Sequence, residues 1–308
     1  MVKRLISCAG SEMQSFSKEE FLESIAGSEG RVLAAETIGT LQPMLGDVTN
    51  AEFAAAMGAD LLILNMFDVC HPVIRALPEV PEEETIRELK RLTGRKIGIN
   101  LEPADEKQAA SSADTMWKMT GGRMATAVNA EKAVAMGADF IVLTGNPGMG
   151  VSNRNIIKSL EEMKEAVGSR AVLIAGKMHG SGILTESGES IITEQDVSAF
   201  ISAGADIILL PAPGTVPGTT MEYIRKLTVY AHERGALVMT AVGTSQEGAD
   251  TDTVKRIALM CKMAGADIHH IGDAGYGGIA LPEDILAYSV AVRGVRHTYH
   301  RMAQSVIR

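Results

Sequence analysis

The chain has 308 residues, 46% of them hydrophobic and 22% charged, which provides enough apolar material for a substantial core and argues against disorder. It carries 38 acidic residues against 29 Lys and Arg, a formal net charge of −9, and no basic run long enough to follow a phosphate backbone, which argues against nucleic acid as the main partner. The three cysteines are scattered and form no CxxC pair, so the sequence predicts neither a disulfide framework nor a zinc site.

Residues 1–30 precede the first predicted strand. Their basic opening reaches Gly10 before an apolar core of signal-peptide length appears, and no apolar run of roughly 18 to 20 residues occurs in the chain. We therefore expect a cytoplasmic protein without a membrane span. Ser17 and Glu20 form a capping box for a short helix over 20–26, which we expect to cover the bottom of the domain that residues 31–308 form.

A phrase of the form Gly-Ala-Asp followed by apolar residues recurs four times in the rest of the chain. Each copy combines a helix end, a glycine suited to a left-handed helix C-cap, and a buried strand. The copies begin at Gly58, Gly137, Gly204 and Gly265. Four further apolar runs alternate with them, at residues 31–37, 96–102, 171–179 and 236–244. Helical segments follow the strands, for example at 152–167, 194–203, 220–234 and 253–264.

Eight strand–helix units are the number that closes a parallel barrel. The sequence therefore predicts an α/β fold, a single (β/α)₈ TIM barrel over residues 31–308, with residues 1–30 as a short N-terminal helical extension. A doubly wound open sheet is the alternative, but no dinucleotide-binding glycine motif follows the first strand. The long connection 103–127 is interpreted as a lid or an oligomer contact, and the 17 Met residues are compatible with a homo-oligomer.

Strand side chains alternate between the two faces of a sheet, so one inward position determines the others on its strand. Asn65 and Thr144 share one place in the repeat, and we expect both at the barrel mouth. If these positions face inward, alternation on the repeat strands turns His270 inward and His269 toward the helices. On the other strands, we chose the phase that puts small residues inside: Ala34, Gly98 and Ala175. This phase directs further polar residues into the mouth: Glu36, Asn100, Glu102, Lys177 and His179, with Thr240 as an optional member.

The predicted mouth thus gathers a ring of ionisable residues that we interpret as catalytic: Glu36, Glu102, Lys177, His179 and His270. Buried charge is costly unless it is paired or used, and a structural ion-pair network is the alternative interpretation. The repeat aspartates lie instead at the strand starts, the end of a barrel that serves stability, where we expect them to cap turns. They are Asp60, Asp139, Asp206 and Asp267.

Two glycine-containing loops follow the last two strands, where barrels commonly hold phosphate. Glycines let backbone amides approach an anion, and the amino end of the next helix, near Pro282, adds its dipole. The predicted substrate- and phosphate-binding set is Asn65, Asn100, Thr144, Gly243, Thr244, Ser245, Gly275, Gly277 and Gly278. The loop 144–150 has the glycine content of a Walker motif but no Lys-Ser/Thr pair, so it is not predicted to bind a nucleotide.

The four Gly-Ala-Asp strands and the paired terminal loops resemble the ribulose-phosphate-binding (β/α)₈ barrel superfamily over about residues 31–300. The phrase from Gly137 to Gly145 is similar to one in the BtpA family of barrels. The stretch through Ser28-Glu29-Gly30-Arg31 resembles an uncharacterised bacterial barrel family often labelled haloacid-dehalogenase-like hydrolase. Residues 250–254 match the nucleophile motif of haloacid-dehalogenase phosphatases. No apolar strand immediately precedes them, however, so we interpret these residues as a helix cap.

The leading functional hypothesis is a lyase or isomerase acting on a small phosphorylated metabolite, preferably a sugar phosphate, by proton transfer next to a carbonyl. Lys177 near Glu36 or Glu102 would provide an acid and a base, a Schiff base, or a charge that holds an enolate.

Two alternatives stay open. In a Mg²⁺- or Mn²⁺-dependent lyase of the phosphoenolpyruvate mutase type, the oxygen-rich ligands would be Glu36, Asp68 and Glu102, with His179 as an optional addition. The other alternative, implied by the BtpA resemblance, is a non-catalytic barrel that binds a metabolite or assists assembly.

Overall fold

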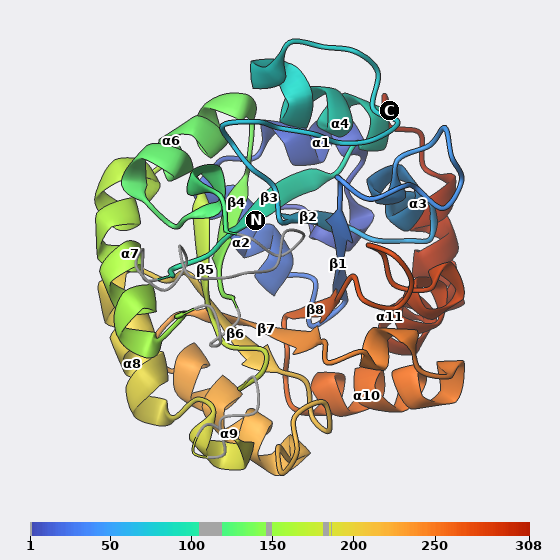
Figure 1. Ribbon diagram of the computed structural model, residues 1–308. Coiled ribbons are helices and arrows are strands. Elements are labelled where there is room, and N and C mark those ends of the chain that lie inside the picture. The colour runs from blue at the N-terminus through green and yellow to red at the C-terminus, as the bar shows by residue number, and fades with distance from the viewer. Residues whose placement is uncertain (1, 105–118, 146–149, 181–184, 186) are drawn as a thin grey trace.

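Eight parallel strands close into a barrel in which each strand pairs with the next in chain order and the last pairs with the first (Figure 1). The computed structural model describes residues 2–104, 119–145, 150–180, 185 and 187–308. The strands are β1 (Val32–Ile38), β2 (Leu61–Asn65), β3 (Lys96–Leu101), β4 (Phe140–Leu143), β5 (Val172–Gly176), β6 (Ile207–Pro211), β7 (Leu237–Val242) and β8 (Ile268–Ile271). The predicted TIM barrel is therefore confirmed.

Helices surround the strands as an outer ring (Figure 1). They are α3 (Asn50–Ala56), α4 (Thr85–Thr93), α6 (Ala127–Met136), α7 (Asn153–Val167), α8 (Glu194–Ala203), α9 (Met221–His232), α10 (Thr251–Met263) and α11 (Pro282–Ala303). Short 3-10 turns occur at η2 (Glu82–Glu84), η3 (Gly121–Arg123), η6 (Gly188–Ser190) and η7 (Gln246–Gly248). None of the helices in the described residues combines the length and apolar character needed to span a bilayer.

Helix α10 begins two residues before its predicted start because Asp250 caps it. The Asp250 carboxylate accepts hydrogen bonds from the backbone amides of Asp252 and Thr253, at 3.1 and 3.0 Å. This geometry confirms that residues 250–254 are a helix cap. The middle of the predicted lid, 105–118, and residues 146–149 of the loop after β4 lie outside the described residues.

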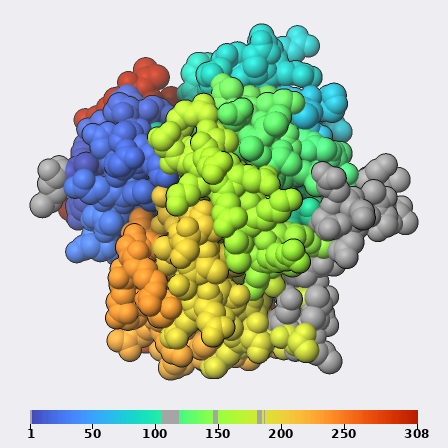
Figure 2. Space-filling view, turned by 90° about the vertical axis from the view of Figure 1, so that its left-hand side faces the viewer, coloured from blue at the N-terminus to red at the C-terminus, as the bar shows by residue number. Residues whose placement is uncertain are grey.

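The amino-terminal segment contains η1 (Leu5–Ser7), α1 (Gly10–Ser15) and α2 (Lys18–Ala26). Ser17 and Glu20 form the predicted capping box, and because Ser17 is the N-cap the helix starts at Lys18 rather than at Glu20. Apolar side chains from this segment, including Phe21, pack into one cluster with interior barrel residues, and the rings of Phe21 and Phe140 lie 6.3 Å apart. The segment therefore shares a core with the barrel interior, and Figure 2 shows the blue amino-terminal residues gathered on the left-hand side.

The four repeat aspartates make the same contact four times. Each carboxylate accepts a hydrogen bond from a backbone amide near the start of the preceding strand. The pairs are Leu33–Asp60 at 2.9 Å, Ile97–Asp139 at 2.9 Å, Leu173–Asp206 at 2.8 Å and Val238–Asp267 at 2.8 Å. Each aspartate also contacts a basic side chain. The repeated phrase therefore has a local cause: it ties each αβ turn to the neighbouring strand.

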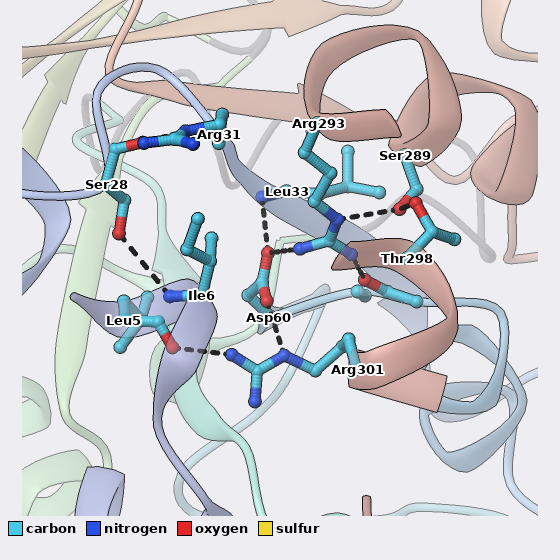
Figure 3. A network of polar contacts seen from close by, with 12 residues as sticks. Leu5, Ile6, Ser28, Arg31, Leu33, Asp60, Ser289, Arg293, Thr298 and Arg301 are labelled. Carbon is cyan, nitrogen blue, oxygen red and sulfur yellow. Dashed lines mark hydrogen bonds and ion pairs between the residues drawn. The ribbon is translucent and has the colours of Figure 1, made fainter. Parts of the chain in front are cut away.

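Asp60 differs from the other three because it is completely buried (Figure 3). Its two oxygens pair with Arg293 at 2.5 Å and Arg301 at 2.6 Å, both from α11. Arg301 also donates to the carbonyl oxygens of Leu5 and Cys8, at 2.6 and 3.0 Å. This cluster joins the amino-terminal segment, β2 and the last helix.

Side chains in the barrel alternate as predicted on most strands. Ala34, Ile63, Val142 and Leu209 belong to the interior cluster, whereas Leu33 packs among the outer residues that face the helices.

Two predicted orientations are wrong. On β5, Val172 and Ile174 fill the interior and Ala175 faces the helices, because the barrel accommodates branched side chains at this level instead of small ones. Thr240 is also outward, since its neighbours Val238 and Val242 both lie in the outer cluster.

Candidate active site

Glu36 and His270 contact each other at the carboxyl ends of neighbouring strands. Parallel pairing sets Ala34 beside His270, so Glu36, two residues further along β1, projects from the same face. The Glu36 Oε2 and His270 Nε2 atoms lie 3.3 Å apart, and both side chains are buried. The structure thus brings together two of the predicted catalytic residues.

A chain of hydrogen bonds leads from β3 to the loop after β8. The Asn100 Nδ2 group donates to Asn65 Oδ1 at 3.1 Å, and Asn65 Nδ2 donates to Asp273 Oδ2 at 2.9 Å. Burial, followed by the negative charge of Glu36, raises the pKa of Asp273 to about 7. Sequence reasoning missed Asp273, because it lies in the loop after β8, beyond the strand alternation that identified the other mouth residues.

Glu247 is a second carboxyl that the sequence analysis did not select. It lies in η7, is buried, and accepts a hydrogen bond from the Ala274 amide through Oε1 at 3.2 Å. Burial raises the pKa of Glu247. Backbone hydrogen bonds and the nearby His270 lower this pKa, and the negative charge of Glu36 raises it. The loops after β7 and β8 thus add two carboxyls, Glu247 and Asp273, to Glu36.

Glu102 is held by Arg123, which the sequence analysis also missed. The two buried side chains form an ion pair, and the Glu102 amide donates to the Arg123 carbonyl at 2.8 Å. Burial raises the pKa of Glu102, and the nearby arginine only partly offsets that effect. Arg123 comes from η3, far from β3 in sequence, so strand alternation gave no signal for it.

Several buried polar atoms near the carboxyl ends of the strands have no hydrogen-bond partner in the part of the chain that the structure describes. They are Asn100 Oδ1, Thr144 Oγ1, Glu247 Oε2 and His270 Nδ1. Buried polar groups are normally paired, because desolvation without a partner is unfavourable. Water or a polar ligand would satisfy these atoms.

The prediction that Lys177 and His179 lie in the mouth assumed that Ala175 faces inward. Because Ala175 faces the helices, strand alternation no longer supports this placement, which stays a prediction. Lys177, directly after β5, is buried. His179 is partly buried, and burial lowers its pKa.

The predicted phosphate loops have mixed features. Gly243 and Gly277 have open space where a side chain would project, and Thr244 and Ser245 adopt left-handed φ values of 58° and 69°. The Thr244 hydroxyl is engaged, since it donates to the Thr215 carbonyl at 2.7 Å.

The other two predicted glycines have structural reasons to be glycine. A Cβ on Gly275 would lie 2.8 Å from the Glu247 carbonyl oxygen, and Gly278 has a φ of 83° and accepts from the Ile38 amide at 2.9 Å. The Asp250 carboxylate already caps α10, so the dipole of that helix has an anionic partner. Phosphate binding here stays a prediction.

Asp68, the remaining predicted metal ligand, accepts hydrogen bonds from its own loop. Its Oδ1 accepts from the backbone amides of Cys70 and His71, at 2.7 and 3.2 Å. No group of three His, Cys, Asp or Glu side chains within the described ranges is arranged to hold a metal ion. The donor set therefore does not fit the predicted metal site among Glu36, Asp68 and Glu102.

The fold and mouth define a TIM barrel with ionisable groups at the carboxyl ends of its strands. Residues 6–308 match the family described as "Domain of unknown function (DUF7916)", and the chain belongs to that family. No curated protein matches it.

Solved structures similar to this chain include an archaeal fructose 1,6-bisphosphate aldolase, with a TM-score of 0.56, 13% identity, and 89% of this chain and 98% of that chain covered. A Schiff base forming fructose-1,6-bisphosphate aldolase is similar with a TM-score of 0.53, 15% identity, and 89% and 97% covered. At these identities the likeness shows the barrel fold alone. It supports neither a specific BtpA relationship nor the haloacid-dehalogenase label.

Proposed function

We propose that this protein is an enzyme, a lyase or isomerase that acts on a small phosphorylated metabolite by moving a proton next to a carbonyl group. The observation that carries the proposal is the cluster of Asp273, Glu36 and His270 at the carboxyl end of the barrel. A carboxyl whose pKa is about 7 is half ionised near neutral pH, which suits a group that both accepts and returns a proton.

In the proposed reaction, the Asp273 carboxylate removes a proton from the carbon next to the carbonyl, and the electron pair moves onto the carbonyl oxygen. His270 Nε2 lies 3.3 Å from Glu36 Oε2, and His270 Nδ1 has no partner among the described residues, so in this proposal Nδ1–H donates to the substrate carbonyl oxygen. When the deprotonated carbon carries a hydroxyl, the intermediate is an enediolate; return of the proton to the former carbonyl carbon, with transfer of the hydroxyl proton to the other oxygen, gives the isomer. In a lyase, the enolate carbon instead attacks the carbonyl carbon of a second molecule, whose oxygen takes the proton from Asp273, and cleavage is the reverse of this step.

The hydrogen bond from Asn65 orients Asp273 toward this task. It fixes one carboxyl oxygen at 2.9 Å, and Asn100 in turn fixes the Asn65 amide. Asn65 and Asn100 are therefore positioning residues in this proposal.

The phosphorylated substrate class rests on the open backbone at Gly243 and Gly277 and agrees with the sugar bisphosphate named for the two similar aldolases. The predicted role of Lys177, which is buried directly after β5, is to contact the developing negative charge on the substrate. Borohydride reduction in the presence of substrate distinguishes a Schiff base from a charge contact, because only the former leaves a covalent adduct on Lys177.

The test is a panel of phosphorylated ketoses and aldoses, each beside its dephosphorylated counterpart, followed by proton and phosphorus NMR. We expect conversion of at least one phosphorylated compound and a much slower reaction of its counterpart. The control for contaminating activity is a preparation of Asp273→Asn made in parallel. Equal rates with and without the phosphate group would contradict the substrate class, and no conversion of any member would contradict the enzyme.

A further inference from the structure

A polar pocket lies at the opposite end of the barrel from the mouth. It has a volume of about 260 Å³ and is lined by Arg4, Ile6, Ser7, Arg296, His297 and His300. The two walls come from η1 with the residue before it and from the end of α11. Helix α11 is interrupted at Gly294, with φ 76° and ψ 163°. Residues 295–303 therefore form a separate short helix beside η1.

The lining is basic and contains no acidic side chain. Arg4 makes one long hydrogen bond, to the Ser7 hydroxyl at 3.4 Å. Over the stretches of chain that the structure describes, Arg296, His297 and His300 have no carboxylate partner. Such a group of basic side chains is unexpected on a chain whose formal charge is −9.

Charges beyond the lining add to this positive potential. Figure 3 shows that the Asp60 cluster next to Ile6 contains two arginines, Arg293 and Arg301, around one carboxylate. Burial lowers the pKa of His297, and four arginines lower it further: Arg296, Arg31, Arg4 and Arg293. Arg31 is itself paired with Glu29 at 2.5 Å, outside the lining.

We propose that this pocket binds a small anion that carries a phosphate group. The guanidinium fork of arginine matches phosphate oxygens, and the imidazole N–H groups supply further donors. The volume is below the range of roughly 300 to 1,000 Å³ that holds drug-sized ligands, so inorganic phosphate or a short phosphate monoester fits best. The ligand joins η1 to the last helix and adds negative charge where the fold has an excess of arginine.

The test uses the full chain with ¹³C-labelled histidine, whose imidazole signals for His297 and His300 are assigned by substitution. Inorganic phosphate is titrated at constant ionic strength, with sodium chloride in the parallel arm and glycerol phosphate in a third. We expect saturable shifts of both signals with phosphate or its monoester and none with chloride. Arg4→Gln and Arg296→Gln are each expected to weaken binding by about tenfold or more, as for a lost charge-assisted hydrogen bond.

Arg256→Gln, which removes an exposed arginine of α10, is the matched control and should leave binding unchanged. Histidine shifts with inorganic phosphate alone would identify free phosphate as the ligand. Shifts with glycerol phosphate as well would show that the pocket also accepts a phosphate monoester. Equal shifts with chloride, or shifts that survive both arginine substitutions, would overturn the proposal. Because the readout is on two histidines far from the mouth, its result is independent of whether the proposed enzyme activity is found.

Discussion

Substitution of Asp273 by asparagine is expected to lower the rate on the phosphorylated substrate by about 10²- to 10⁴-fold, the range that a positioned acid–base group contributes. The wild-type rate should rise with pH through an apparent pKa of about 7, as the base ionises. That value belongs to a coupled group, since Glu36, Glu247 and His270 also influence Asp273. The variant should lose this rising limb of the pH–rate profile.

Stability separates this role from a structural one. The folded pKa of Asp273, about 7, lies above its ordinary value of 3.8, so the folded protein loses stability as pH rises between these two values. Asp273→Asn removes that loss and should be at least as stable as wild type at neutral pH. Glu233→Gln, at an exposed carboxylate after α9, is the matched control and should change neither rate nor stability. A variant that keeps both the rate and the rising limb would refute the assignment.

Substitution of Asp60 by asparagine is expected to cause the largest loss of stability among the substitutions of the repeat aspartates. The expected loss is about 3 to 5 kcal/mol, because the substitution leaves buried arginines without their counter-ion. Burial by itself would raise the pKa of Asp60, but Arg293 and Arg301 outweigh it and hold the pKa below its ordinary value. The stabilisation is therefore present above the unfolded pKa and is lost as pH falls through the folded one. Urea unfolding at several pH values measures both effects.

Asp206→Asn is the matched control because Asp206 occupies the same place in the repeat. It accepts from the Leu173 amide at 2.8 Å and pairs with Lys18 at 2.8 Å, but this pair is partly exposed. Its loss should be about 1 to 2 kcal/mol. Similar losses in the two variants would show that the buried arginines contribute nothing beyond the shared turn contact.

The fold was predictable because its repeat has a local physical cause. Each Gly-Ala-Asp phrase ends a helix and ties the next strand to the previous one through a side-chain contact such as that of Asp139 with the Ile97 amide. Alternation then placed Glu36 and His270 at the same barrel mouth, and the parallel register of β1 and β8 makes them neighbours. These inferences need only local sequence and strand geometry.

The rest of the site depends on tertiary packing. Small size was a poor guide to the inward face of β5, because Ile174 fits inside the barrel where Ala175 was expected. Asp273, Glu247 and Arg123 lie in loops or short turns, whose paths do not follow the alternation of a strand. Their approach to the mouth is set by contacts between segments that are distant in the sequence.

The most direct test of the central claim is hydrogen exchange from solvent into a phosphorylated ketose, such as dihydroxyacetone phosphate or ribulose 5-phosphate, followed by NMR in D₂O. Proton transfer next to the carbonyl predicts deuterium at that carbon with wild type and Glu233→Gln, and little with Asp273→Asn. Turnover of a phosphorylated substrate without exchange at this carbon, or exchange that Asp273→Asn leaves unchanged, would contradict the account.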